Sequence, residues 1–107
     1  MSHEPLPQPD EPLRSQFAAR QALLDRVRSL LVRQLGLRRE PDEIDPDTPL
    51  FGTGLGLDSV DAVELVVGVE AEFGIKVPEG RVAAGALRTV NGVVDFVLIA
   101  QEARRAH

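Results

Sequence analysis

The chain has 107 residues, of which 43% are hydrophobic and 27% are charged, and its formal net charge is −5 at pH 7. This length and composition are those of a single globular domain, and the negative charge argues against nucleic acid or an anionic membrane as the main partner. Because the chain has no cysteine, a disulfide, a thiolate metal site and a cysteine nucleophile are excluded. It shows neither a signal peptide nor an apolar run long enough to span a bilayer, so we expect a cytoplasmic protein without a membrane span.

The first part of the chain divides into a proline-rich segment and a helix. Residues 1–14 contain four prolines and few apolar residues, which is typical of a disordered lead-in. We expect residues 15–107 to form the domain. Apolar residues at three- and four-residue steps predict a helix over residues 15–37, with Gly36 as the stop signal after Leu35.

Charge is distributed unevenly along the chain. Arginine dominates between residues 20 and 39, and we expect these arginines to form the solvent-exposed side of the first helix. Acidic residues dominate from residue 40 to residue 79, where Lys76 is the only base. Such asymmetry indicates either a charged partner or two solvated faces.

Residues 40–56 are expected to form a long loop, because prolines and glycines interrupt the segment repeatedly. Loops of this length are usually functional. Ile44, Leu50 and Phe51 are apolar enough to attach the loop to the core. The segment opens like a calcium-binding loop, but Pro49 stands where the third ligand should be, so a calcium site is excluded.

Residues 59–73 predict the second helix, although five valines in this segment would also suit a strand. The segment follows a glycine-rich loop, and either Asp58 or Ser59 is a suitable N-cap. A helical period places four apolar residues on one buried face, namely Ala62, Val66, Val69 and Phe73. It places three acids and a glycine on the opposite face, namely Asp61, Glu64, Gly68 and Glu72. The apolar edge between these faces, beside the acids, has the character of a docking surface, in which charge steers a partner and apolar side chains seat it.

The last third of the chain predicts two further helices. Gly74 ends the second helix, and residues 75–78 are expected to cross the core in extended form. Residues 79–87 predict a short, glycine-interrupted third helix. Thr89 then caps a last helix from residue 90 to about residue 104. The sequence therefore predicts an all-α fold with four helices.

Catalytic chemistry has little support in the sequence. His3 and His107 lie near the two chain ends, so Ser59 has no plausible general base. Ser59 also stands in the sequence LDSVD and not in a G-x-S-x-G elbow. We therefore expect a protein that is not an enzyme. What the position of Ser59 offers is a hydroxyl at the positive end of a helix, where a phosphate group is readily held.

Residues 57–66, LDSVDAVELV, closely resemble the phosphopantetheine attachment region of acyl carrier proteins. The similarity continues through residues 70–78, and it extends back to residues 30–37 and forward to residues 89–97. This resemblance implies a small four-helix bundle of the acyl carrier type, with a long loop between its first two helices. It also implies that Ser59 carries 4′-phosphopantetheine, which a separate phosphopantetheinyl transferase takes from coenzyme A. The terminal thiol of that arm would hold an acyl group as a thioester, a thiol that a chain without cysteine must borrow.

The resemblance and the helix pattern together assign roles to further residues. Asp58 would assist transient Mg²⁺ binding during arm transfer, and no stably bound metal is expected. The residues expected to dock partners are Val60, Asp61, Glu64, Val67, Ala71 and Glu72. The residues expected to line an acyl pocket between the last three helices are Val63, Val66, Val69, Val77, Val82, Leu87, Val90 and Val94.

We expect a monomer that docks on the transferase and on acyl-transferring and ketosynthase-type enzymes with basic docking patches. The glycine-rich loop, the basic first helix and the proline-rich lead-in depart from housekeeping fatty acid carriers. A specialised stand-alone carrier for a modified lipid or a polyketide is therefore as consistent with the sequence as a fatty acid carrier. Two alternatives stay open, namely a peptidyl or aminoacyl carrier and an acidic helical adaptor without an arm.

Overall fold

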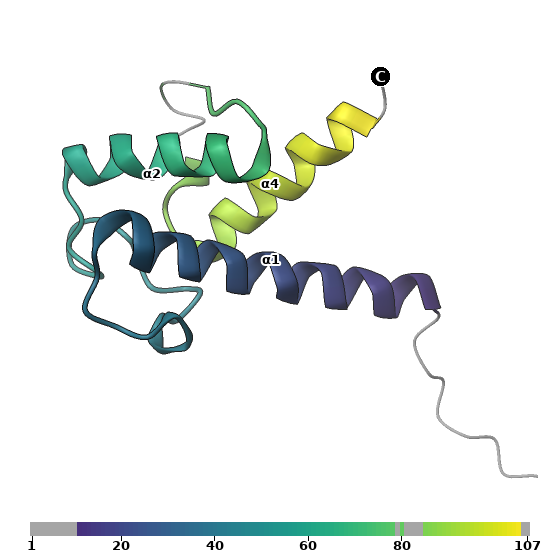
Figure 1. Cartoon of the computed structure of the whole chain (residues 1–107), viewed down its shortest axis with the longest axis horizontal. Coiled ribbons are helices and arrows are strands. Elements are labelled where there is room, and N and C mark those ends of the chain that lie inside the picture. Colours follow the sequence, from purple (N-terminus) through teal and green to yellow (C-terminus); the bar gives the residue numbers. More distant parts are fainter. Residues whose placement is uncertain (1–10, 79, 81–84, 106–107) are drawn as a thin grey trace, which may run out of the picture.

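The computed structural model describes residues 11–78, 80 and 85–105, and the side chains from residue 14 onward within those ranges. The described elements are helices, namely α1 (Glu11–Leu35), the short 3-10 helix η1 (Pro41–Glu43), α2 (Ser59–Phe73) and α4 (Val90–Arg105), as Figure 1 shows. This confirms the all-α fold. Most of the expected third helix lies outside the described residues, and of that segment Gly85 and Ala86 have helical backbone.

Helix α1 begins earlier than the sequence pattern indicates. It starts at Glu11, so residues 11–14 belong to the helix and the expected boundary after residue 14 is wrong; residues 1–10 lie outside the described part of the chain. The reason is Pro12, which reads as a helix breaker in an interior but is well tolerated in a first turn. In that turn its fixed φ suits the helix and its missing N–H leaves no bond unmade.

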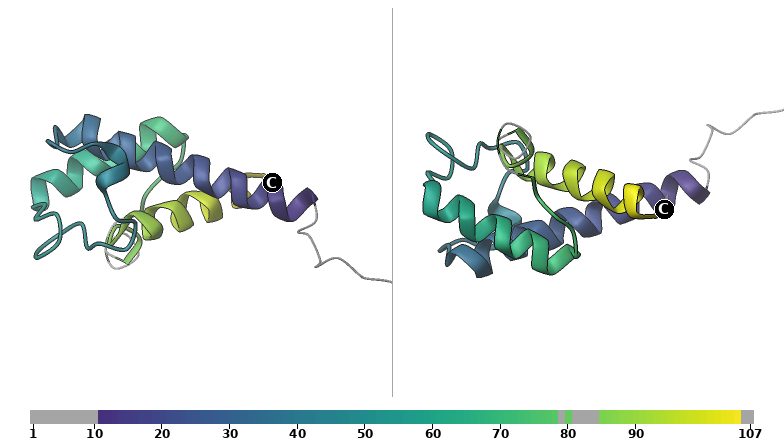
Figure 2. Two further views of the ribbon diagram at one scale, coloured as in Figure 1. Left: turned by 90° about the horizontal axis from the view of Figure 1, so that it is seen from below. Right: turned by 90° about the horizontal axis from the view of Figure 1, so that it is seen from above.

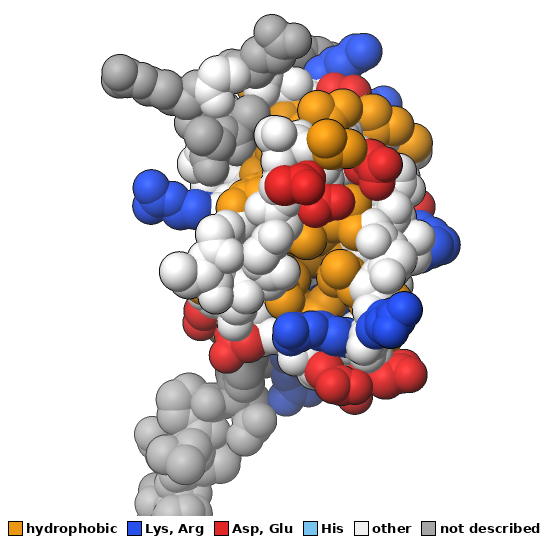
Figure 3. Space-filling model, turned by 90° about the vertical axis from the view of Figure 1, so that its left-hand side faces the viewer, with side chains coloured by type: hydrophobic (Ala, Val, Ile, Leu, Met, Phe, Trp, Pro, Cys, Tyr) orange, Lys and Arg blue, Asp and Glu red, His pale blue; other side chains and the backbone are white. Residues whose placement is uncertain are grey.

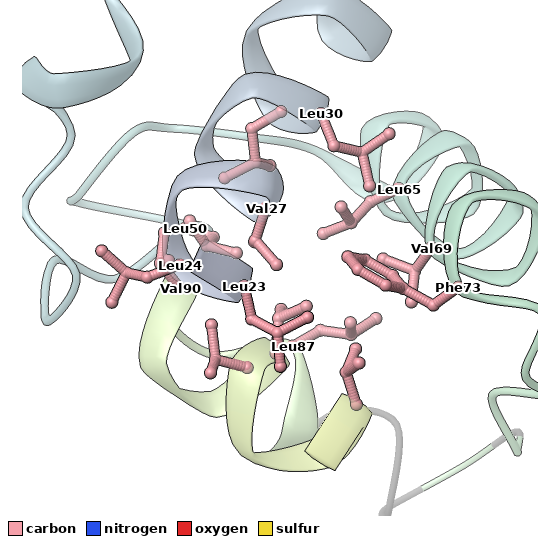
Figure 4. Packing of buried hydrophobic residues seen from close by; sticks show 14 of the residues in the cluster. Leu23, Leu24, Val27, Leu30, Leu50, Leu65, Val69, Phe73, Leu87 and Val90 are labelled. Carbon is pink, nitrogen blue, oxygen red and sulfur yellow. The ribbon is translucent and has the colours of Figure 1, made fainter. Parts of the chain in front are cut away.

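The core lies between α1 on one side and α2 and α4 on the other. Figure 4 shows Leu65, Val69 and Phe73 of α2 directed toward Leu23 and Val27 of α1. Helix α4 contributes four buried valines, which are Val90, Val93, Val94 and Val97. Such a continuous cluster is the main stabilising contribution in a domain of this size.

Gly68 lies on the buried side of α2 and not on the acidic face where the helical period placed it. A β-carbon at this position would lie 3.2 Å from Cδ1 of Leu30 and 3.2 Å from Cδ of Gln34. The missing side chain is what lets α2 approach α1 so closely. The inner face of α2 is therefore centred on Leu65, Gly68 and Val69, which turns the whole helix relative to the expected orientation.

The loop between α1 and α2 is attached to the core at several points. Ile44 and Leu50 are buried, as predicted, and Phe51 is half-buried. The Leu50 N–H donates to the carbonyl oxygen of Arg88 at 2.8 Å, and the Leu57 N–H donates to the carbonyl oxygen of Leu50 at 3.1 Å. These bonds hold the end of the loop beside the beginning of α4.

A polar cluster joins the loop to both long helices. The Asn91 side chain donates to Oδ1 of Asp47 at 2.6 Å and accepts from Nη2 of Arg20 at 3.1 Å. The Asn91 backbone N–H donates to the carbonyl oxygen of Pro46 at 3.0 Å. Arg20 also pairs with Asp95 at 2.6 Å, so α1, α4 and the loop meet here.

The arginines of α1 are more than a solvated face. Arg20 contacts α4, Arg26 pairs with Glu72 of α2 at 3.2 Å, and Nε of Arg28 donates to the carbonyl oxygen of Ile44 at 2.9 Å. Part of the basic run is therefore matched inside the molecule by acids and carbonyls that lie far from it in the sequence.

The bounds of the two later helices agree with prediction. Helix α2 spans residues 59–73 as expected, and Gly74 ends it in the left-handed conformation with φ 65°. The hydroxyl of Thr89 accepts from the N–H of Gly92 at 3.0 Å, which confirms Thr89 as the cap of α4. Ile75 and Val77 are buried in the extended segment that follows Gly74.

None of the helices in the described residues is long and apolar enough to cross a membrane.

Candidate functional site at the beginning of helix α2

Ser59 is the first residue of α2 and lies at the end of the molecule shown on the left of Figure 1. Its position is fixed by the residue before it, because Asp58 is the N-cap with extended backbone (φ −108°, ψ −174°). Oδ1 of Asp58 accepts from the N–H of Asp61 at 2.9 Å, and Oδ2 of Asp61 accepts from the N–H of Asp58 at 3.0 Å. This reciprocal capping box decides between the two possible N-caps and defines where the helix begins.

The Ser59 side chain is exposed to solvent. Nothing among the described residues hydrogen-bonds its hydroxyl. The N–H groups of Ser59 and Val60 precede the first intrahelical bond, which runs from the N–H of Ala62 to the carbonyl oxygen of Asp58 at 3.0 Å. The site therefore presents a free hydroxyl beside unpaired N–H groups at the positive end of a helix dipole.

A row of exposed apolar side chains runs from Ser59 along α2. Val60, Val63 and Val67 are 65%, 64% and 55% exposed, so all three face solvent. Ala71 is exposed one turn further along. Figure 3 views this end of the molecule, and its upper part, where α2 lies, shows hydrophobic side chains next to carboxylates. We call Val60, Val63, Glu64, Val67 and Ala71 the α2 face.

Some acidic side chains of α2 form hydrogen bonds or ion pairs within the described part of the protein, and one does not. Asp61 is part of the capping box, and Oε2 of Glu70 accepts from the N–H of Val77 at 2.8 Å. Glu64 is exposed and has no polar partner within the described residues. Glu64 is therefore the acid of α2 that is free to meet another molecule.

Glu72 does not lie on the α2 face, contrary to its place among the expected docking residues. It pairs with Arg26 at 3.2 Å and with Arg33 at 3.7 Å, both on α1. Arg26 in turn lies over the ring of Phe73, 4.6 Å from its centroid. The rotation of α2 that buries Gly68 also brings Glu72 against the basic helix, so this carboxylate joins two helices.

The residues expected to line an acyl pocket divide into three groups. Most are buried in the core cluster, namely Val69, Val77, Leu87, Val90 and Val94, and Val66 packs against it. Val82 lies outside the described residues. Val63 is 64% exposed, so its assignment to the interior is wrong. It belongs to the α2 face, because it lies three residues after Val60 and four before Val67.

The sequence pattern shows which residues share a helix face with Val63. Val60, Val63, Glu64, Val67 and Ala71 stand at positions i, i+3, i+4, i+7 and i+11, which is one face of a helix. Centring the inner face on Leu65 and Val69 leaves this row outside. The period alone does not say which face is the inner one, and the close approach of Gly68 to α1 decides that Val63 lies outside.

Comparison with known proteins identifies the family of the chain. The family described as "Phosphopantetheine attachment site" matches residues 25–97. Relatives called acyl carrier protein come from Cyanidioschyzon merolae (40% identical over 78 residues, 73% of this chain and 80% of the relative) and Sulfurovum sp. (40% over 76 residues, 71% and 95%). Another, from Thermosynechococcus vestitus, is 35% identical over 75 residues, which are 70% of this chain and 86% of the relative.

The match covers the loop, the capping box, α2 and the first half of α4, and it leaves the first part of α1 outside. The chain therefore belongs to the acyl carrier protein family, non-catalytic carriers built on a phosphopantetheine attachment domain.

Proposed function

We propose that Ser59 carries 4′-phosphopantetheine and that the protein delivers acyl groups held as thioesters on this arm. The observation that carries the proposal is the exposed hydroxyl at the first position of α2, free of bonds to the described residues and inside the family match. The chain supplies no thiol of its own, since it has no cysteine. When attached, the arm supplies the thiol that forms the thioester.

The residues around Ser59 fit a phosphodiester. The unpaired N–H groups of Ser59 and Val60 are donors for its oxygens, and the dipole of the 15-residue helix favours a negative charge there. The carboxylates of Asp58 and Asp61 each accept a hydrogen bond from the other residue's backbone N–H group, which fixes the backbone on both sides of Ser59. The attachment point is thereby rigid, while its hydroxyl is accessible to an enzyme.

Asp58 has capacity left for a transient metal ion. Its Oδ1 accepts the capping bond from Asp61, and no described residue bonds its Oδ2. A carboxylate oxygen is a suitable ligand for Mg²⁺, which binds through one or two carboxylates together with substrate phosphates. We propose that Asp58 contributes this oxygen while the transferase and coenzyme A are bound.

The α2 face is proposed as the docking surface for the transferase and for acyl-handling enzymes. Exposed valines give apolar contacts, and the unpaired Glu64 gives charge that steers a basic partner. Weak, charge-steered docking suits a carrier that must leave each enzyme after its visit. Asp61 and Glu72, which the sequence assigns to the same surface, have internal bonds and are expected to contribute less.

A place for the acyl chain is proposed in the core beside α2. Val69, Val90 and Val94 are completely buried and Val66 packs on the same cluster. These side chains fill the space in the structure, so an acyl chain would enter by separating them. The proposal therefore requires that α2 and α4 move apart when cargo is loaded.

We propose that the protein serves the synthesis of fatty acids, modified lipids or polyketides. The relatives are named acyl carrier proteins, which favours acyl over aminoacyl cargo. Cargo of the protein from its native cell is best identified by mass spectrometry of the thioester.

Intact mass spectrometry tests the attachment. The wild-type protein, incubated with coenzyme A, Mg²⁺ and a broad-specificity phosphopantetheinyl transferase, is expected to gain the mass of one arm. The Ser59→Ala variant is expected to gain nothing, because the accepting hydroxyl is gone.

Ser15→Ala is the matched control, since Ser15 is also an exposed helical serine but lies in α1. It should be modified as fully as the wild type. An unmodified wild type, or a Ser59→Ala variant that gains the arm equally, would show that the assignment is wrong.

A further inference from the structure

A second apolar site lies at the end of the molecule opposite to Ser59. Helices α1 and α4 both continue past the end of α2, as Figures 1 and 2 show, and a groove of about 880 Å³ lies between them. Its walls include Phe17, Arg20 and Leu23 of α1, and Leu98, Ile99 and Glu102 of α4. All of its lining residues fall before residue 25 or after residue 97, outside the family match.

The groove holds the exposed large hydrophobic side chains that the α2 face does not account for. In the described part of the chain, the exposed large hydrophobics are three valines of the α2 face together with Phe17 and Ile99. Phe17 is 64% exposed and Ile99 is 69% exposed, one on each wall. Exposed aromatic and aliphatic side chains on the two walls of an open groove are typical of an interaction site.

Helix α1, which forms one wall of the groove, begins with several turns whose described side chains are exposed. From Glu11 to the start of the family match, α1 runs for about 21 Å at 1.5 Å per residue. Helices in proteins are stabilised chiefly by packing of an apolar face and only weakly by propensity. Leu23 and Leu24 are buried in the core, but the side chains of residues 14–19 are exposed, and an occupant of the groove would add packing on this part of the helix.

The charges of the groove indicate the kind of occupant. Arg20 is already paired with Asp95 at 2.6 Å. The other charged lining residues, Glu102 and Arg105, have opposite signs and adjacent positions on the last two turns of α4. A surface with balanced charge does not select a strongly acidic or basic partner, but it does complement a second copy of itself.

The distribution of acidic residues over the rest of the protein also favours association of two copies through their grooves. Acidic residues concentrate between residues 40 and 79, in the loop and α2 at the other end of the molecule. Two copies that meet through their grooves would keep these like charges far apart. Both Ser59 hydroxyls would then point outward and stay accessible.

We infer that the α1–α4 groove is a two-fold association site in which a second copy of this chain places its Phe17 and Ile99 against those of the first. The groove is about 20 Å long and, with two helices side by side, about 20 Å wide, so each copy covers about 400 Å². This is below the size of a standard stable interface. The dimer is therefore weak, and it forms at concentrations of tens to hundreds of micromolar.

Sedimentation velocity over about 5–500 µM tests the inference. The weight-average mass of the wild type is expected to rise from the 11.6 kDa of the monomer toward twice that value. Phe17→Glu and Ile99→Glu are each expected to weaken association at least about tenfold, because each buries a carboxylate at the centre of the contact. Circular dichroism checks that both variants, which change exposed helical residues, keep their helices.

Val63→Glu is the matched control, since Val63 is as exposed as Phe17 but lies on the α2 face. It should associate like the wild type. Loss of association in Val63→Glu would mean that α2 of one copy enters the groove of the next, which overturns the two-fold arrangement. Ser59→Ala should also associate normally, so this test is independent of the proposed function.

Other occupants of the groove give different results. A wild type that stays monomeric to 500 µM overturns the inference. So does a monomer whose Phe17 and Ile99 NMR signals shift only on removal of residues 1–10, or only on addition of phosphatidylglycerol vesicles.

Discussion

Both ends of this molecule have exposed apolar side chains, but the backbone that carries these side chains is held differently at each end. At the Ser59 end, the capping box of Asp58 and Asp61 and the bonds of Leu50 and Leu57 fix the backbone around the apolar row. At the groove end, α1 and α4 extend without a third element of the described chain against them. The carrier end also lies within the family match, and the groove end lies outside it.

This difference shows which part of the molecule the attachment chemistry constrains and which part it does not. A hydroxyl that an enzyme must find has to stand at a defined place, which calls for a rigid helix start. The extension of α1, which ends before residue 25 and so lies far from Ser59 in sequence, has no such requirement, and its surface can serve another purpose. The comparison also predicts where substitutions will be tolerated.

The largest effect on stability is expected in the shared core. Leu65→Ala removes a completely buried side chain of α2, and we expect a loss of about 3 kcal/mol in the free energy of unfolding. Phe17→Ala removes a larger side chain that is 64% exposed, and we expect a loss of less than about 0.5 kcal/mol.

Urea denaturation of both variants at a few micromolar measures this contrast, because the proposed dimer is not populated there. If Phe17→Ala destabilises the monomer as much as Leu65→Ala does, then the groove end is part of the cooperative core and the comparison of the two ends fails.

A smaller effect is expected from the loop that leads to Ser59. A β-carbon at Gly54 would overlap the backbone carbonyl of Pro49, whose oxygen also accepts from the N–H of Leu55 at 2.9 Å. Backbone cannot move aside as a side chain can, so we expect Gly54→Ala to lower the free energy of unfolding by about 2 kcal/mol. Its rate of modification by the transferase should also fall, because the loop precedes the attachment site.

Gly85→Ala is the control for this substitution, since a β-carbon at Gly85 meets no atom within 4 Å. It is expected to leave both stability and modification unchanged. Equal stability of the two alanine variants, measured by the same urea titration, would show that the loop adapts and does not position Ser59.

The bounds of α2 and the start of α4 could be predicted because their signals are local. Asp58, Gly74 and Thr89 are capping residues whose chemistry is readable from a few neighbours, and Ser59 stands inside a specific motif. The start of α1 was harder to predict, because Pro12 breaks a helix in its interior but is tolerated in its first turn.

The orientation of α2 could not be predicted, because it depends on contact with another helix. Gly68 reads as a polar-face residue by period, yet its missing side chain admits Leu30 and Gln34 of α1. Once α2 turns to fill that space, Glu72 meets the arginines of α1 and Val63 faces solvent. One tertiary contact thus accounts for all three misplaced residues.

The smallest effect on stability, and the most selective effect on docking, is expected at Glu64. Glu64→Lys reverses the charge of an exposed residue without polar partners among the described side chains, so stability should change by less than about 0.5 kcal/mol. The association rate with a transferase that presents a basic patch should fall about tenfold at low salt, because steering is lost. Asp61→Lys would be a poorer test, since it also removes the bond to the Asp58 N–H.

Stopped-flow measurement of transferase binding at several salt concentrations separates steering from damage to the fold. A steering effect shrinks as salt screens the charges, whereas a structural defect persists. Glu102→Lys makes the same charge change at the groove end and should leave transferase binding unaltered. If Glu64→Lys and Glu102→Lys slow binding equally, then the transferase senses only net charge, and the α2 face has no particular claim as its docking surface.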